Sequence, residues 1–167
     1  MEFELRDWKL KDAENIVHYA NNPKVAETLR NAFPHPYTLD DAHTFISQSI
    51  HQNKTIQSIK AIAVDGEAIG SIGLILQGDV SCKSGELGFW LGESFWGKGI
   101  MTKAIIQACD NGFKNFDIVR IYARPFAGNI GARKALENAG FELEGIFKKS
   151  IYKNENILDS CMYALVK

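Results

Sequence analysis

The fold is decided by the stretch Gly92-Glu93-Ser94-Phe95-Trp96-Gly97-Lys98-Gly99-Ile100-Met101. Residues 85–92, which lead into it, alternate between apolar and other side chains as in a strand. Apolar residues then recur at helical spacing as far as residue 116, and a strand rich in β-branched residues follows at 118–124. A strand, a helix and a strand in this order predict a parallel crossover between the two strands.

Hairpin patterns flank this unit on both sides. Residues 58–64 and 68–76 have strand patterns and are joined by Asp65-Gly66, a strong two-residue turn signal. Residues 141–152 and the alternating C-terminal segment form a second hairpin around a turn at 154–156. Because hairpins join antiparallel strands, the sheet is expected to be mixed and mostly antiparallel.

Helical patterns occupy much of the remaining chain. Asp12 is placed to cap one helix, and Thr38 with Asp41 resembles a capping box at the start of another. A further helix is expected to begin at Asn129 and to end at Ala139, with Gly140 as its C′ glycine and Phe141 as the hydrophobic C″ residue. We therefore predict an α+β fold (α/β by a looser label), with helices on both faces of the sheet and a single domain over residues 1–167.

Composition narrows the class of protein. The 167 residues are 46% hydrophobic and 23% charged, which is typical of a globular domain. A net charge of −1 gives no basic excess for nucleic acid, and no apolar run approaches the ~20 residues of a membrane span. Cys82, Cys109 and Cys161 form no C-x-x-C pair, which argues against a disulfide framework and a metal site. We expect a cytoplasmic protein that binds no nucleic acid, no membrane and no metal.

The glycines of the opening stretch predict an anion site. The first turn of the following helix offers unpaired backbone N–H groups and the positive end of the helix dipole, and Lys98 adds a charge. The segment begins like a nucleotide-binding P-loop, but Gly99 stands where Ser or Thr should hold magnesium. It also begins like a dinucleotide fingerprint, whose third glycine is missing. A phosphotransferase with a degenerate P-loop stays open as an alternative.

Two ordered blocks resemble a known family. Residues 95–104, Phe-Trp-Gly-Lys-Gly-Ile-Met-Thr-Lys-Ala, resemble the acetyl-CoA pyrophosphate loop of the GNAT N-acetyltransferases, in the form found in the RimJ/RimL-like branch of ribosomal-protein N-terminal acetylases. Residues 129–141 resemble the family's second block, and residues 86–89 resemble the strand before the loop. The resemblance covers nearly the whole chain. It departs at Ala132, where the family has Ser, and at Leu136, where many members place a Tyr that protonates the leaving thiolate.

The resemblance implies direct transfer of an acetyl group from acetyl-CoA, as co-substrate, to a primary amine, either a protein N-terminus or a small molecule. It also implies a parallel strand pair that splays apart at the cofactor site. The missing Tyr favours an alternative, a non-catalytic acyl-CoA-binding or sensing domain. The protein is expected to be a monomer or a homodimer. The implied cofactor-binding residues are Phe89, Trp90, Leu91, Trp96, Gly97, Lys98, Gly99, Ile100, Met101 and Asn129.

Catalytic and acceptor-side residues are harder to assign. Glu86 is the first choice for the general base because it starts the strand before the loop, although it could be a structural carboxylate. Tyr152 and Ser150, on the C-terminal hairpin, are candidates for protonating the thiolate. The candidate acceptor-binding residues are His35 and Tyr37, in a proline-rich loop, and Asp159, which could bind a cationic amine or pin the hairpin.

Overall fold

The computed structural model describes residues 1–167. A single seven-stranded sheet organises the chain. Its strand order is β1-β2-β3-β4-β5-β7-β6, and every neighbouring pair is antiparallel except β4 and β5. The strands are β1 (Glu4–Arg6), β2 (Gln57–Val64), β3 (Glu67–Leu76), β4 (Ser84–Leu91), β5 (Arg120–Ala123), β6 (Glu142–Lys153) and β7 (Asn156–Val166). The predicted fold class is confirmed.

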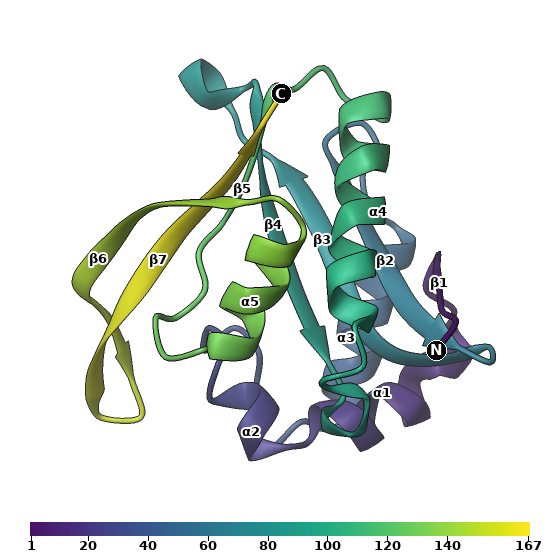
Figure 1. Cartoon of the computed structure of the whole chain (residues 1–167). Coiled ribbons are helices and arrows are strands. Elements are labelled where there is room, and N and C mark those ends of the chain that lie inside the picture. The colour runs from purple at the N-terminus through teal and green to yellow at the C-terminus, as the bar shows by residue number, and fades with distance from the viewer.

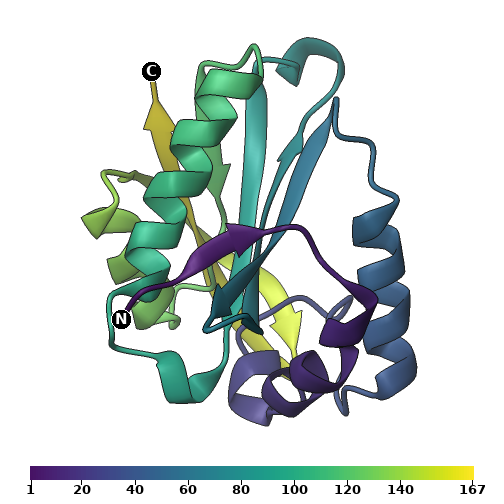
Figure 2. The same ribbon diagram turned by 90° about the vertical axis from the view of Figure 1, so that its right-hand side faces the viewer.

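Helices cover both faces of this sheet. Their bounds are α1 (Ala13–Ala20), α2 (Pro23–Ala26), α3 (Leu39–Ile50), α4 (Ile100–Asn115) and α5 (Ile130–Asn138). α4 and α5 lie in front of the sheet in Figure 1, and the view in Figure 2 shows α1 and α3 on the other side. Short 3-10 turns occupy Leu10–Asp12, Asp79–Ser81 and Glu93–Phe95.

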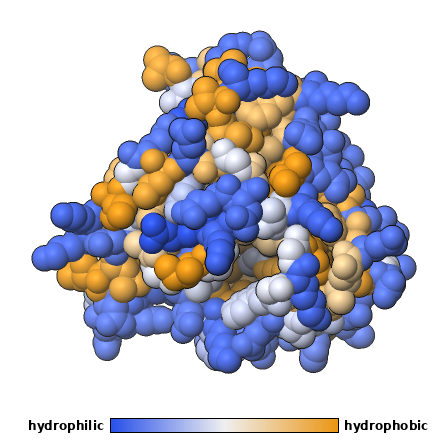
Figure 3. All heavy atoms as spheres, viewed as in Figure 1, coloured by the Kyte–Doolittle hydropathy of each residue, from blue (hydrophilic) through white to orange (hydrophobic).

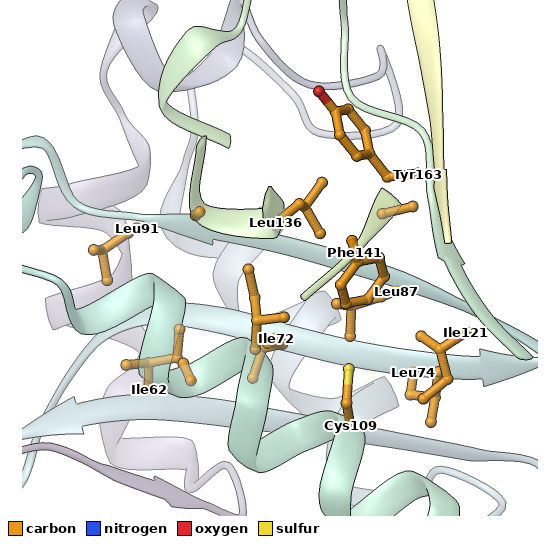
Figure 4. Close-up of a cluster of buried hydrophobic side chains, with 14 of the residues drawn as sticks. Ile62, Ile72, Leu74, Leu87, Leu91, Cys109, Ile121, Leu136, Phe141 and Tyr163 are labelled. Carbon is orange, nitrogen blue, oxygen red and sulfur yellow. The ribbon is translucent and has the colours of Figure 1, made fainter. Parts of the chain in front are cut away.

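Each face of the sheet has its own apolar core. Figure 4 shows the larger one, where side chains from the sheet meet Cys109 of α4 and Leu136 of α5. The sheet contributes Ile62, Ile72, Leu74, Leu87, Leu91 and Ile121. A smaller cluster under α1 and α3 includes Trp8, Ile16 and Ile46. Burial of these side chains, rather than intrinsic propensity, holds the short helices in place.

Turn chemistry that was expected from the sequence is present at two sharp reversals. The β2–β3 turn places Asp65 at φ 50° and Gly66 at φ 83°, as a two-residue hairpin turn requires. Gly140, at φ 96°, ends α5, and its N–H donates to the Glu137 carbonyl at 3.0 Å. The Phe141 N–H donates to the Leu136 carbonyl, also at 3.0 Å, which completes a Schellman C-cap.

The two predicted N-caps have different outcomes. The capping box is confirmed at α3, where Thr38 and Asp41 bond each other's backbone N–H groups. The prediction for Asp12 was wrong: its carboxylate makes no cap bond to α1 and instead accepts from Arg6 at 2.8 and 2.9 Å and from the Lys9 N–H. Asp12 ends a 3-10 turn in helical backbone conformation, so its side chain cannot take a cap position.

The parallel pair β4–β5 is short, and this creates a fork in the sheet. The two strands pair only at Ser84–Arg120, Gly85–Ile121 and Glu86–Tyr122. β5 is accordingly shorter than the predicted strand at 118–124. Beyond Glu86 the strands diverge, and α5 lies across the opening (Figure 1). The edge of β4 that faces the fork is therefore left without a strand partner.

Candidate active site

A cavity of about 660 Å³ lies at the fork, between the end of β4, the start of α4, the start of α5, and α2. The β4 side chains that line it are Phe89, Trp90 and Leu91. The loop and first turn of α4 contribute Phe95, Trp96, Gly97, Gly99, Ile100, Met101 and Thr102. Residues 128–132 line the side formed by α5. The structure thus brings together all the sequence-predicted cofactor residues except Lys98, which does not line the cavity.

Two glycines shape the loop that enters α4. Gly97 has φ 73° and Gly99, the N-cap of α4, has φ 77°, a region that residues with a side chain adopt at a cost. A Cβ atom built on either glycine would meet no atom within 4 Å. The glycines are therefore required by the backbone conformation, and they leave the backbone open to the cavity.

The same loop presents unpaired backbone donors. None of the N–H groups from Gly97 to Thr102 donates to an acceptor within the protein. They stand at the positive end of the 16-residue helix α4, which favours an anionic ligand. The ammonium of Lys98 lies 5.5 Å from the centre of the Phe95 ring, close to this turn.

Contacts from three directions hold this loop in place. The indole N–H of Trp96 donates to the Leu91 carbonyl at 2.8 Å, which ties the loop to the end of β4. The Phe95 ring packs edge-on against Tyr19 of α1 at 5.6 Å. Glu93 accepts from Lys24 at 2.8 Å and from Asn22 at 3.1 Å, which joins the loop to α2. These two bonds lower the pKa of the Glu93 carboxyl.

The start of α5 forms the opposite wall. The Asn129 side chain accepts from the Ala132 N–H at 3.2 Å, so the residue caps the helix and also lines the cavity. Behind this wall, the buried Tyr163 hydroxyl donates to Glu137 at 2.6 Å and accepts from Arg133 Nε at 3.0 Å. Arg133 also donates to the Ala127 carbonyl at 2.9 Å. The network fixes the turn before Asn129 against β7.

Helix α2 is a wall of the cavity that sequence reasoning missed. Val25, Thr28 and Leu29 line the cavity from this side. The sequence shows a short helical pattern here, but a four-residue helix carries no local signal of what it packs against. Its position depends on tertiary contacts, among them the Lys24–Glu93 ion pair.

Glu86 lies at the base of the fork, on the sheet face opposite α4 and α5, and does not line the cavity. Its carboxylate accepts from Arg124 Nε at 3.2 Å, and Arg124 Nη2 lies 3.1 Å from the same oxygen. Tyr122 is the neighbour of Glu86 on β5, and its pKa is raised by burial and by the Glu86 charge. A carboxylate, a guanidinium and a phenol therefore gather where the strands separate.

The three hairpin candidates lie outside the cavity. Tyr152 is 70% exposed on β6, and hydrophobic side chains gather over this hairpin at the left of Figure 3. The Ser150 hydroxyl lies 2.7 Å from that of Ser160 and donates to the Phe147 carbonyl. Asp159 accepts from the Lys149 N–H at 2.8 Å. In this conformation Asp159 makes the contact expected of a residue that pins the hairpin.

The candidates in the 33–37 loop have different surroundings. His35 is exposed, whereas Tyr37 is buried among the residues under α1 and α3, and this burial raises its pKa to about 12. The Tyr37 ring lies 5.1 Å from that of Phe33, which in turn meets Trp90 at 5.5 Å. Tyr37 therefore supports the cavity-lining Trp90 through Phe33.

Two further findings concern the chain as a whole. No three His, Cys, Asp or Glu side chains are grouped so that they could hold a metal ion. None of the helices combines the length and the apolar character that crossing a bilayer would require. The site offers a cradle for an anionic group at one end and an acid–base cluster beside the fork at the other.

Comparisons with known proteins agree with this geometry. A family model described as an acetyltransferase (GNAT) domain matches residues 2–142. The chain is 29% identical over 152 residues to the putative ribosomal N-acetyltransferase YdaF of Bacillus subtilis (strain 168), a match that covers 90% of this chain and 76% of that protein.

Solved structures share the whole architecture. The microcin C7 self immunity acetyltransferase MccE, in complex with acetyl-CoA and AMP, superposes with a TM-score of 0.85 at 26% identity, over 99% of this chain and 93% of that one. RimL, a ribosomal L7/L12 alpha-N-protein acetyltransferase in complex with coenzyme A, gives a TM-score of 0.84 at 22% identity, over 98% and 93%. The second likeness is one of fold alone.

Proposed function

The chain belongs to the acetyltransferase (GNAT) domain family, and we propose that it transfers the acetyl group of acetyl-CoA to a primary amine. One observation carries this proposal: the cavity in the β4–β5 fork meets the unpaired N–H groups of residues 97–102. A ligand that has a long neutral arm and an internal diphosphate matches such a cavity and such a helix end. The solved relative MccE, which binds acetyl-CoA, supports the choice of ligand.

Each part of the site receives a role in this proposal. The N–H groups of residues 97–102 bind the diphosphate, with Lys98 adding charge. The arm runs along Phe89, Trp90 and Leu91 on the edge of β4 that lacks a strand partner, and Asn129 contacts it from the opposite wall. Backbone N–H groups of β4 then hold the thioester oxygen as negative charge develops on it.

Glu86 is proposed as the general base. A primary amine is mostly an ammonium at neutral pH, so a proton must leave before the nitrogen attacks the thioester carbon. Glu86 lies at the base of the fork. An amine that approaches from the open sheet face can reach its carboxylate directly or through a water molecule. With Leu136 in place of the family's Tyr, the thiolate is protonated from solvent, which is adequate for a group with a pKa near 8.5.

The acceptor is a protein N-terminus or a small-molecule amine. The first kind is supported by YdaF, which is described as a putative ribosomal N-acetyltransferase.

The proposal is tested by binding and turnover together. Calorimetry with acetyl-CoA, CoA and ATP should show binding of the two CoA compounds and none of ATP. Release of free thiol with a panel of amines should then reveal turnover. Tight ATP binding would favour a phosphotransferase, and acetyl-CoA binding without thiol release by any amine would favour a sensing domain.

A further inference from the structure

A short row of side chains along β4 forms a footprint beside the cavity. Glu86, Gly88 and Trp90 share one face of the strand because successive side chains alternate, and they stand opposite Ile75, Gly73 and Ser71 of β3. Gly88 is exposed, and a Cβ atom built on it would meet nothing within 4 Å. The row therefore consists of a carboxylate, an open space over the backbone, and an indole.

The charged end of this footprint has two opposite charges in contact. Arg124 follows the last residue of β5 and reaches Glu86 through Nε at 3.2 Å and Nη2 at 3.1 Å. The Arg124 side chain is 48% exposed and that of Glu86 is 22% exposed. The remaining guanidinium nitrogen, Nη1, has no partner in the protein, so Arg124 can still receive an anion in its planar fork.

The apolar end of the footprint is rigid. The Trp90 ring packs edge-on against Phe33 at 5.5 Å, and Phe33 packs against the buried Tyr37. Trp90 also lines the cavity, as does Phe89, the residue directly after Gly88. A molecule seated over Gly88 would therefore be next to the acyl group of a bound thioester.

Resting on the proposed function, we infer that the acceptor is a free α-amino acid with an apolar side chain. The amino and carboxylate groups of such a molecule are attached to one carbon, so they need a receptor with opposite charges in contact. Glu86 receives the ammonium, Arg124 receives the carboxylate, and Trp90 contacts the side chain. Arginine binds carboxylates through two parallel hydrogen bonds, which lysine cannot reproduce.

Other classes of amine fit this face less well. A polyamine needs several free carboxylates, but Glu144 is bound by Arg120 at 2.6 and 2.9 Å, and Asp159 accepts from the Lys149 N–H. A protein N-terminus has an amide in place of the carboxylate at the same carbon. It would lack the charge-assisted hydrogen bonds that a free carboxylate makes to Arg124.

The acceptor's carboxylate also has a role in the chemistry. When the substrate carboxylate binds Arg124, it places the ammonium beside Glu86, which takes a proton from it. The neutral nitrogen then bonds to the thioester carbon and loses its second proton to solvent, the carbon–sulfur bond breaks, and the thiolate gains a proton from solvent.

The test compares each amino acid with its own amide. L-Leucine and L-phenylalanine should be acetylated with kcat/KM at least about tenfold higher than leucinamide and phenylalaninamide, since a charge-assisted bond is lost in the amides. Arg124→Gln should remove most of this preference by raising the KM of the acids, and Arg124→Lys should restore only part of it. Arg120→Gln is the matched control, because Arg120 begins the strand that Arg124 follows but is bound to Glu144, and it should keep the preference.

Several results would overturn the inference. Equal or better turnover of the amides, of a peptide N-terminus or of spermidine would do so, as would an Arg124→Gln variant that slows acids and amides by the same factor. Thermal melting of each variant separates such effects from loss of the fold. No thiol release with any amine would overturn the proposed function itself and the acceptor class with it.

Discussion

The two ends of the site are built in different ways. At the cofactor end, the loop of residues 97–102 presents backbone N–H groups, and its shape depends on glycines at positive φ. At the proposed acceptor end, β4 presents the side chains of Glu86 and Trp90, with Gly88 leaving space between them, and Arg124 follows β5. The cofactor end is encoded within ten consecutive residues, whereas the acceptor end is assembled from segments that are distant in the sequence.

This difference explains which end of the site can be adapted to a different ligand. A backbone cradle suits a ligand that stays the same, because almost any side chain can vary around it without altering the N–H groups. A side-chain footprint on an open sheet face can be altered one residue at a time. We therefore expect variants at the two ends to separate cleanly, with cofactor affinity affected at one and acceptor turnover at the other.

The largest effect is expected at the acceptor end. Glu86→Gln keeps the size of the side chain but removes the proton acceptor, so kcat should fall by roughly 10²–10⁴ while the Kd for acetyl-CoA stays nearly constant. The loss should shrink at high pH, where more of the amine is already neutral. Steady-state kinetics from pH 6 to 10 check this, and unchanged turnover at every pH would assign the base to another group or to water.

The buried Tyr37 ring supports Trp90 through Phe33, so its removal should lower the stability of the fold. Tyr37→Ala deletes a buried ring and should cost about 3–5 kcal/mol of unfolding free energy, as other aromatic-to-alanine changes in cores do. Tyr37→Phe is the control and should stay close to wild type. Urea unfolding measures both. A Tyr37→Ala protein of normal stability would mean that the ring does not support Phe33 and Trp90.

A moderate effect is expected at the cofactor end. Gly99→Val places a branched side chain at φ 77° beside the diphosphate position, so acetyl-CoA affinity should fall at least tenfold, or about 1.4 kcal/mol. Gly66→Val is matched to it, since Gly66 has φ 83° and the same free space but lies in the distant β2–β3 turn. Calorimetry measures the acetyl-CoA affinity of both variants. An equal loss of affinity in the two would show that backbone strain at a glycine causes it, and not the side chain beside the diphosphate.

The smallest effect is expected at the ion pair between α2 and the loop that leads into α4. Lys24 holds the pKa of Glu93 below its usual range, so the pair is intact above the ordinary carboxyl pKa of about 4 and is lost as the pH falls below it. Both side chains are exposed, and Glu93→Gln should change the Kd for acetyl-CoA by less than about threefold. The small difference from wild type should vanish in high salt. A tenfold loss would place α2 in direct control of the cofactor.

The sequence predicted the backbone-built parts of the molecule well. The glycine loop, the Asp65-Gly66 turn, the Gly140 cap and the parallel crossover depend on local conformation or on the order of elements, and all are present. The RimJ/RimL-like GNAT resemblance is likewise confirmed by the family model and by relatives that include a putative ribosomal N-acetyltransferase. These features depend on residues that are close together in the sequence, so a single sequence is enough to predict them.

The parts that sequence reasoning missed depend on contacts between distant segments. Arg124 meets Glu86 only because β4 and β5 are parallel and part after Glu86, and α2 reaches the cavity through an ion pair with Glu93. The Asp12 prediction failed because Asp12 ends a 3-10 turn in helical backbone conformation, and its carboxylate is bound by Arg6 of β1. No local pattern distinguishes these side chains from ordinary surface charges.

Hydrogen exchange of the backbone amides, with and without acetyl-CoA, tests the central claim most directly. We predict that acetyl-CoA slows exchange at residues 97–102, whose N–H groups have no partner in the protein, and at Gly131 in the first turn of α5. Amides of the β2–β3 turn at Asp65 and Gly66 should be unaffected. Saturating acetyl-CoA that leaves residues 97–102 unprotected would contradict the account, because the ligand would then be bound somewhere other than the backbone cradle at the start of α4.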